Sequence, residues 1–195
     1  MLTHLFKLIW NKKKQNFLLT VELLVSFMVI FAVFTLLTYA YTNFRKPMNF
    51  KYENVWTANY GIPEGMKDPD SIALAVESLK KSILAMPQVE SLSFASSNVP
   101  FSANTMNNSF TYKNQELYSD FYVVEKGYQD VLGLTLVAGS WFSRDDKAHS
   151  KPVVINESLK ERFFGNENAL GKILMEGKNR LKVVGIVADF KSKGD

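Results

Sequence analysis

The chain has 195 residues, with 23 Lys and Arg, 19 Asp and Glu, and no cysteine. The lack of cysteine excludes a disulfide scaffold and thiolate metal sites. The net charge of +4 comes from residues 1–16, which hold Lys7, Lys12, Lys13 and Lys14 and no acidic side chain. The rest of the sequence is neutral and shows no clustering of Lys and Arg, which argues against a nucleic-acid-binding domain.

Residues 1–16 predict a short amphipathic helix on the inner membrane surface. Leu2, Leu5, Phe6 and Ile9 recur at helical spacing, while the lysines can face lipid head groups. The residues that we expect at this membrane interface are Trp10, Lys12, Lys13 and Lys14. A disordered basic leader is the alternative interpretation.

Residues 17–41 form an apolar run of 25 residues with one charge, Glu22. A helix of this length can cross a bilayer core of roughly 30 Å. The run is longer than a signal-peptide core, and the residues after it offer no small-residue cleavage site. We therefore predict a retained transmembrane helix, with the lysines in the cytoplasm and residues from 42 onward on the far side.

Two features mark the ends of the predicted transmembrane helix. Glu22 lies near its cytoplasmic end, so we interpret it as reaching the interface or pairing with the nearby lysines; a transport role is the alternative. Tyr39 and Tyr41 suit the outer interface, and Pro47 prevents the helix from continuing.

Residues 42–97 predict a βαβ unit packed on one sheet. Alternation over 52–60, and the apolar residues Val89, Leu92, Phe94 and Ala95 within 89–97, indicate strands. Between them, Asp68 is a candidate N-cap and Pro69 a first helical residue, and the helix is expected to reach Met86 before Pro87.

Residues 98–195 predict a β-rich part. The expected strands are 110–112 and 117–124 as a hairpin, then 134–137, 152–155, 173–176 and 181–187. A helical turn over 127–132 is closed by Gly133, and Gly139 ends the strand that follows. Asn156 caps a helix over 157–164, Gly165 stops it, and Gly171 is a turn glycine. The predicted fold class is α+β: two N-terminal helices, then a mixed α/β domain.

Catalytic and phosphate-binding motifs are weak in this sequence. His149 has no nucleophile elbow near it in the sequence, and the acidic pairs Asp145–Asp146 and Glu157–Glu161 read as solvated charge. The segment GNENALGK over 165–172 has five residues between its glycines where a P-loop has four, and isoleucine follows its lysine. We therefore expect no catalytic residue, cofactor site or metal site.

Several segments resemble the periplasmic core domain of MacB-type, FtsX-like ABC transporter permeases. They are GYQDVLGLTLVAGSWFSRDD over 127–146, VVINESLKERFFGNENALGKI over 153–173 and VVGIVADF over 183–190, with MPQVESLSFASSNVPFS over 86–102 before them. Each motif is loose by itself, but their order and spacing match, as do the leading amphipathic and transmembrane helices. The resemblance covers nearly the whole chain.

The resemblance implies a permease subunit of the bacterial inner membrane with four transmembrane helices. A large periplasmic domain, with an α/β porter-like part and a β-rich part, lies between the first two helices. The resemblance further implies that two copies pair, that a separate cytoplasmic ABC ATPase drives them, and that motion is relayed to the periplasmic domain. A periplasmic membrane-fusion or adaptor protein is a further expected partner.

This interpretation predicts that the encoding gene continues past Asp195 with the rest of the domain and three more apolar runs. Two other classes stay open. A single-pass sensor would bind a ligand with its outer domain, and an anchored envelope enzyme would use His149 or an acidic pair. The transported substrate is left open.

Overall fold

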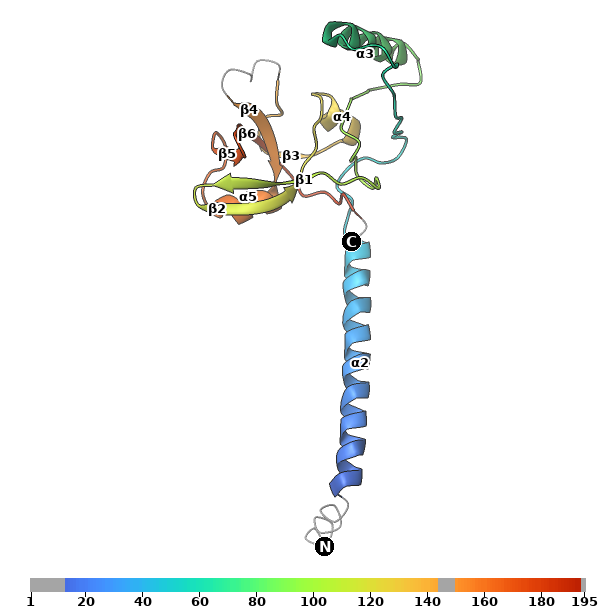
Figure 1. The fold of residues 1–195 in the computed structure, drawn as a ribbon, viewed down its shortest axis with the longest axis vertical. Coiled ribbons are helices and arrows are strands. Elements are labelled where there is room, and N and C mark those ends of the chain that lie inside the picture. Colours follow the sequence, from blue (N-terminus) through green and yellow to red (C-terminus); the bar gives the residue numbers. More distant parts are fainter. Residues whose placement is uncertain (1–12, 144–149, 194–195) are drawn as a thin grey trace. The chain divides into compact units, whose positions relative to one another are not determined.

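The computed structural model describes residues 13–143 and 150–193 (Figure 1). The mixed α+β class is confirmed, with helices and a six-stranded sheet in the described ranges. The chain divides after Lys46 into two compact units. The first unit contains helix α2, and the second contains all the other described elements.

Helix α2 (Lys13–Arg45) is continuous over 33 residues. Within the described ranges it is the one helix long and apolar enough to cross a membrane: the span Phe17–Arg45 contains an 18-residue window with a mean hydropathy of 2.6. The hydroxyls of Thr35, Thr38 and Thr42 each donate to the carbonyl oxygen four residues earlier, at 2.8 Å. These hydroxyls are thus satisfied inside the helix, as a lipid environment requires.

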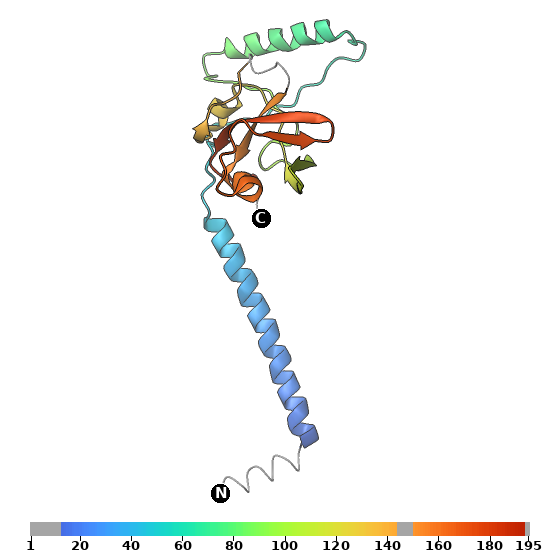
Figure 2. The same cartoon turned by 90° about the vertical axis from the view of Figure 1, so that its left-hand side faces the viewer.

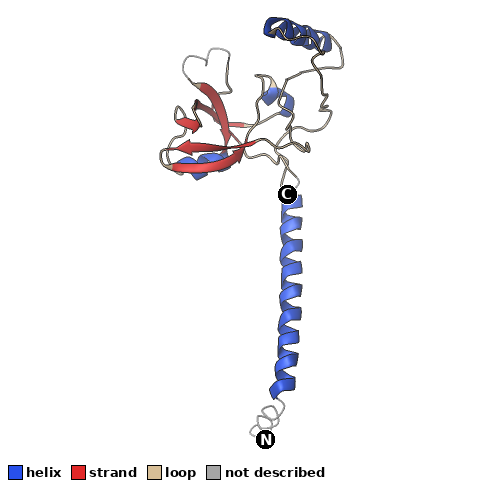
Figure 3. Cartoon of the chain, in the orientation of Figure 1, coloured by secondary structure: helices blue, strands red, loops and turns tan. Residues whose placement is uncertain are grey.

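The sheet of the second unit has the strand order β2-β1-β5-β6-β3, and β4 also pairs with β6 (Figures 1 and 3). The strands are β1 (Asn107–Tyr112), β2 (Gln115–Asp120), β3 (Leu136–Gly139), β4 (Lys151–Asn156), β5 (Ile173–Glu176) and β6 (Asn179–Val187). β4 runs parallel to β6, and the other pairings are antiparallel. β6 is therefore the central strand, with three partners.

Helix α5 (Glu157–Phe164) follows β4 directly and agrees with the predicted range. The side chain of Asn156 accepts a hydrogen bond from the N–H of Leu159 at 3.1 Å, and Gly165 ends the helix with a φ of +52°. Phe163 and Phe164 are buried against the sheet, in a core with Ile155, Leu174, Leu181 and Val183 among others. Gly171, at a φ of +79°, makes the turn before β5.

A second, smaller core lies around α4 (Tyr128–Leu132), which Gly133 closes in the left-handed conformation. Tyr128, Leu132, Leu134 and Val187 are its buried members. Phe50, Val55, Trp141 and Phe190 are among the half-buried side chains packed against it. This core joins residues soon after α2 to the end of β6.

Helix α3 (Pro69–Leu84) lies outside the sheet and has no buried residue (Figure 2). Asp68 accepts hydrogen bonds from the N–H of Ser71 at 2.9 Å and from its hydroxyl at 2.6 Å, which lower the pKa of the Asp68 carboxyl. Pro69 is the first helical residue. The helix ends at Leu84, two residues before the predicted end, and Pro87 follows in a turn.

The predicted strands over 52–60 and 89–97, and the βαβ unit built on them, are wrong. Ala95 forms an isolated bridge with Val124, and residues 56–62 make no backbone hydrogen bond that we find to another described segment. A strand needs a neighbour along its backbone, and the sheet uses other segments. The alternating pattern therefore gives extended chain without a ladder (Figure 3).

The boundaries of several strands also differ from the prediction. The hairpin pairs 107–112 with 115–120, instead of 110–112 with 117–124. Residues 123–125 do not pair with β1 and instead run beside residues 94–96, where the N–H of Ser96 donates to the carbonyl of Val123 at 2.8 Å. β3 begins at Leu136, two residues later than predicted, and includes Gly139 as its last residue.

Candidate functional site

The predicted membrane-interface residues that the structure describes lie toward the two ends of α2. Trp10 and Lys12 lie outside the described residues, while Lys13 and Lys14 begin the helix. Tyr39 and Tyr41 lie near its other end and are exposed. The guanidinium of Arg45 stacks over the ring of Tyr41, 4.9 Å from its centroid, which suits the end of a transmembrane helix.

Glu22 lies on the continuous part of α2, eight residues after Lys14. At 1.5 Å per residue, this spacing separates the two residues by about 12 Å along the helix axis. No ion pair of Glu22 is found among the side chains that the structure describes. A direct pair with Lys14 on the same helix therefore does not fit the geometry, and the interface role of Glu22 stays a prediction.

The candidate enzyme residues do not converge on a site. His149, Asp145 and Asp146 lie outside the described residues, and Glu157 and Glu161 are exposed on α5. Within the described ranges, no group of three or more His, Cys, Asp or Glu could hold a metal ion.

The segment 165–172 does not have the geometry of a phosphate-binding loop. Gly165 ends α5, so the segment follows a helix where a phosphate-binding loop precedes one. The N–H of Gly171 donates to the carbonyl of Val183 at 2.8 Å, and the N–H of Val183 donates to the carbonyl of Lys172 at 2.9 Å. The segment is thus a connection held against β6.

A pocket of about 460 Å³ lies between the two extended segments that do not form strands. Its aromatic lining consists of Phe50, Tyr52, Trp56, Tyr60, Phe94 and Phe101, with Tyr128 at its α4 side. Trp56 is 92% exposed, and the rings of Tyr60 and Phe94 meet edge to face at 5.2 Å. Aromatic surface with a few polar groups is typical of sites for apolar molecules.

The hydroxyl of Tyr128 is buried and finds no hydrogen-bond partner among the described residues. Burial raises the pKa of this phenol. An unpaired buried hydroxyl costs free energy unless a water or ligand atom reaches it. Tyr128 belongs to the small core as well as to the pocket wall, so its main role is to pack in that core.

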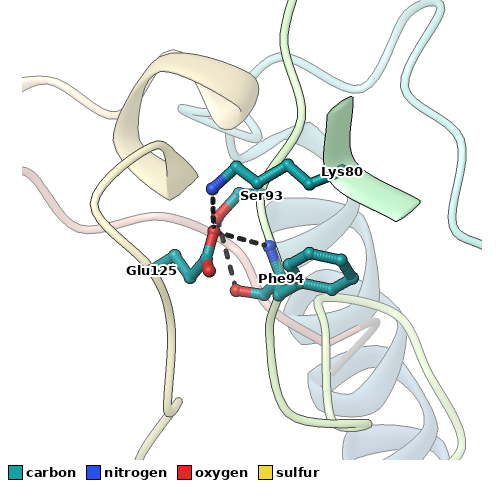
Figure 4. Close-up of polar contacts among 4 residues, drawn as sticks. All are labelled: Lys80, Ser93, Phe94 and Glu125. Atoms are coloured by element: carbon teal, nitrogen blue, oxygen red, sulfur yellow. Dashed lines mark hydrogen bonds and ion pairs between the residues drawn. The ribbon is translucent and has the colours of Figure 1, made fainter. Parts of the chain in front are cut away.

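Glu125 connects α3 to the extended segment around Phe94 (Figure 4). Its carboxylate accepts from Lys80 Nζ at 2.6 Å and from the N–H of Phe94 at 3.5 Å, while its own N–H donates to the carbonyl of Phe94 at 3.0 Å. Ser93 Oγ also donates to that carbonyl, at 3.3 Å. The ion pair between Lys80 and Glu125 thus attaches α3, which has no buried residue, to the extended segment around Phe94.

Asp189 is a structural residue that the sequence alone did not single out. Its carboxylate accepts from Asn156 Nδ2 at 2.6 Å and from the N–H of Ser158 at 3.0 Å, at the first turn of α5. The carbonyl of Asp189 accepts from Asn49 Nδ2 at 2.8 Å. An acidic residue just after a strand is the only sequence signal for this role, and it is shared with many surface residues.

Comparisons with known proteins agree on one family. The family model described as MacB-like periplasmic core domain matches residues 17–195. The macrolide export ATP-binding/permease protein MacB of Neisseria gonorrhoeae is 36% identical over 78 residues, which are 40% of this chain and 12% of that protein. The probable syringafactin export ATP-binding/permease protein SyfD of Pseudomonas syringae pv. tomato is 27% identical over 142 residues, which are 72% of this chain and 21% of that protein.

The chain thus spans about an eighth to a fifth of the length of these two relatives. Among solved structures, the periplasmic region of MacB from Actinobacillus actinomycetemcomitans is 25% identical, with a TM-score of 0.45. The match covers 60% of this chain and 52% of that one.

Proposed function

Because the chain belongs to the family of MacB-like periplasmic core domains, we propose that it is part of the permease subunit of an ABC transporter. The observation that carries this proposal is the extent of the family match, from residue 17 to residue 195. The match includes the transmembrane helix as well as the folded domain. The chain is a membrane-anchored protein with an extracytoplasmic domain.

The distribution of charge supports a proposed orientation. Four lysines precede the apolar run over 17–41, and the sequence beyond residue 16 carries equal numbers of basic and acidic side chains. Under the positive-inside rule, we propose that the N-terminus is cytoplasmic and the domain after Pro47 is periplasmic. The match to a family of periplasmic domains supports the bacterial inner membrane as the location. Since the sequence lacks cysteine, one introduced cysteine at Lys178 and another at Lys14 can be labelled separately in intact cells. A membrane-impermeant maleimide should label the first and not the second.

ATP hydrolysis is proposed to occur on a separate cytoplasmic ABC ATPase subunit. The names of the two relatives combine ATP-binding and permease functions in one protein, so a fused ATPase is the competing arrangement. The 195 residues themselves contain no P-loop motif. Two permease copies and a periplasmic membrane-fusion or adaptor protein complete the proposed assembly.

The work of the domain is proposed to be mechanotransmission: movement of α2 is relayed to the periplasmic domain, which exports a substrate or acts on a periplasmic partner. The relatives' names mention macrolides and syringafactin, so a macrolide is the first export substrate to test. The test is erythromycin accumulation in cells that express the whole permease with its ATPase. Accumulation should fall with the active ATPase and not with an ATPase variant that cannot hydrolyse ATP.

The aromatic pocket favours a second candidate, an anchored sensor whose outer domain binds an apolar ligand. The two functions predict different results in the same cells. A transporter loses its effect when the ATPase is inactivated, whereas a single-pass sensor does not depend on it. A response to ligand that persists without the ATPase would therefore favour the sensor.

A further inference from the structure

The chain becomes fixed to the folded domain within six residues of the end of α2. We call Pro47–Lys51 the exit segment. The carbonyl of Met48 accepts from the N–H of Lys191 at 2.9 Å, and the N–H of Lys51 donates to the carbonyl of Leu132 at 2.7 Å. Between them, Asn49 Nδ2 donates to the carbonyl of Asp189 at 2.8 Å. The exit segment is therefore held to the chain after β6 and to the end of α4.

Asn49 has a left-handed backbone, with a φ of +55°. A non-glycine residue is disfavoured there, although asparagine tolerates it better than most. This backbone conformation sets the course of the chain between Met48 and Lys51. The backbone of Met48 bonds to the chain after β6, and that of Lys51 bonds to the end of α4. Glycine would relieve the backbone at this position, but it has no side-chain donor for the bond to the carbonyl of Asp189.

Asp189 connects this contact to the interior of the domain. Its carbonyl accepts from Asn49, and its carboxylate accepts from Asn156 and from the N–H of Ser158 at the start of α5. β6, which ends two residues earlier, is the strand with three partners. A displacement of Asp189 therefore acts on the central strand and on the first turn of α5 together.

We propose that Asn49 is the residue through which displacement of the membrane helix enters the periplasmic domain. The inference rests on the proposed function, since it names the contact by which the relayed movement reaches the sheet. Pro47 and Met48 follow shortly after α2 along the chain, so a pull on the helix loads the hydrogen bonds of the exit segment. Among these hydrogen bonds of the exit segment, the one made by Asn49 uses a side chain. Its acceptor is Asp189, the residue whose carboxylate also holds the start of α5.

Force measurement on single molecules tests this directly, because cysteines placed at Lys46 and Lys178 give unique handles in a cysteine-free chain. Lys178 lies in the exposed turn just before β6, so the load passes from the exit segment to β6. The detergent-solubilised chain is pulled between these handles, and the lifetime of the first detachment step is recorded at constant force. Loss of one hydrogen bond should shorten this lifetime about fivefold.

Asn49→Gly removes the side-chain bond and keeps the backbone conformation accessible, and Asn49→Asp keeps the size but replaces the donor with a carboxylate. Asn54 is the matched control, because it is exposed and has a φ of +60°, and no hydrogen bond of its side chain is found among the described residues. We expect shorter lifetimes in both Asn49 variants and the original lifetime in Asn54→Gly and Asn54→Asp.

An original lifetime in Asn49→Asp would overturn the proposal, even if Asn49→Gly fails to fold. Equal shortening in the Asn49 and Asn54 variants would also overturn it. The measurement uses no ATPase and no substrate. A failure of the proposed transport function, seen as unchanged erythromycin accumulation, is therefore distinguishable from a failure of this contact.

Discussion

Gly139 and Gly185 are paired across β3 and β6, with no space for a side chain on either residue. A Cβ atom on Gly139 would lie 2.3 Å from the carbonyl oxygen of Val184, and one on Gly185 would lie 2.4 Å from that of Ser140. The N–H of Ser140 donates to the carbonyl of Val184 at 3.0 Å. This close approach joins the small core around α4 to the central strand.

Gly185→Ala should therefore destabilise the domain. The added methyl group meets backbone, which cannot move aside as a flexible side chain can, so we expect a loss of about 1–3 kcal/mol in the free energy of unfolding. Gly61→Ala is the control, because a Cβ there has no atom within 4 Å and Gly61 does not have a positive φ. Urea unfolding of the detergent-solubilised chain measures the free energy of unfolding of both variants. Equal values for Gly185→Ala and Gly61→Ala would show that β3 can move away from β6 without a loss of stability.

Asp189→Ala should destabilise the domain by removing the acceptor at the first turn of α5. The substitution leaves Asn156 Nδ2 and the N–H of Ser158 without their partner. Lost caps cost about 0.5–2 kcal/mol. Asp130→Ala is a suitable comparison, because Asp130 is exposed in the first turn of α4 and the structure gives its side chain no hydrogen bond. A loss of stability no larger than that of Asp130→Ala would contradict the capping role.

Local signals in the sequence were sufficient for the elements that depend on near neighbours. The range of α5 follows from Asn156 and Gly165, and the start of α3 follows from Asp68 and Pro69, because caps act within one turn. The hairpin was predicted, but not its register, since residues 123–125 pair with the chain around Ser96.

Contacts between distant residues could not be predicted in this way. The alternation over 52–60 is the same whether a partner strand exists or not, so it gave a strand where the chain is only extended. Asn49 and Asp189 are 140 residues apart, and neither lies in a motif that indicates a mutual contact. The pocket likewise depends on segments that the sequence places far apart.

Glu125→Gln should loosen α3. Lys80 loses its carboxylate partner, and no residue of α3 is buried to hold the helix in its place. We expect faster amide hydrogen exchange along α3, while β6 exchanges as before, because the pair does not contact the sheet. Glu77→Gln is the control, since this exposed residue of the same helix has no ion pair in the described structure. Unchanged exchange in Glu125→Gln would mean that packing alone holds α3.

The ion pair between Lys113 and Glu167 should make a contribution to the stability of the domain that depends on pH. Lys113 Nζ lies 2.9 Å from Glu167 Oε1, joining the turn between β1 and β2 to the segment after α5. The hydrogen bond and charge of Lys113 lower the pKa of Glu167 below 4.5, and those of Glu167 raise the pKa of Lys113 above 10.5. The stabilisation is therefore fully present between these two values, is lost as pH falls through the lowered pKa, and is lost again as pH rises through the raised one.

Lys113→Met should consequently reduce stability slightly at pH 7 and not at pH 2, where Glu167 is protonated in both proteins. The effect is small and should shrink in 1 M salt, because both side chains are exposed and screened. Urea unfolding of the two proteins at pH 2, 7 and 9 measures it, with Lys178→Met as the control, since Lys178 is exposed and forms no ion pair in the described structure. A difference between Lys113→Met and the original chain that persists at pH 2 would show that packing of the lysine stem, and not its charge, stabilises the turn.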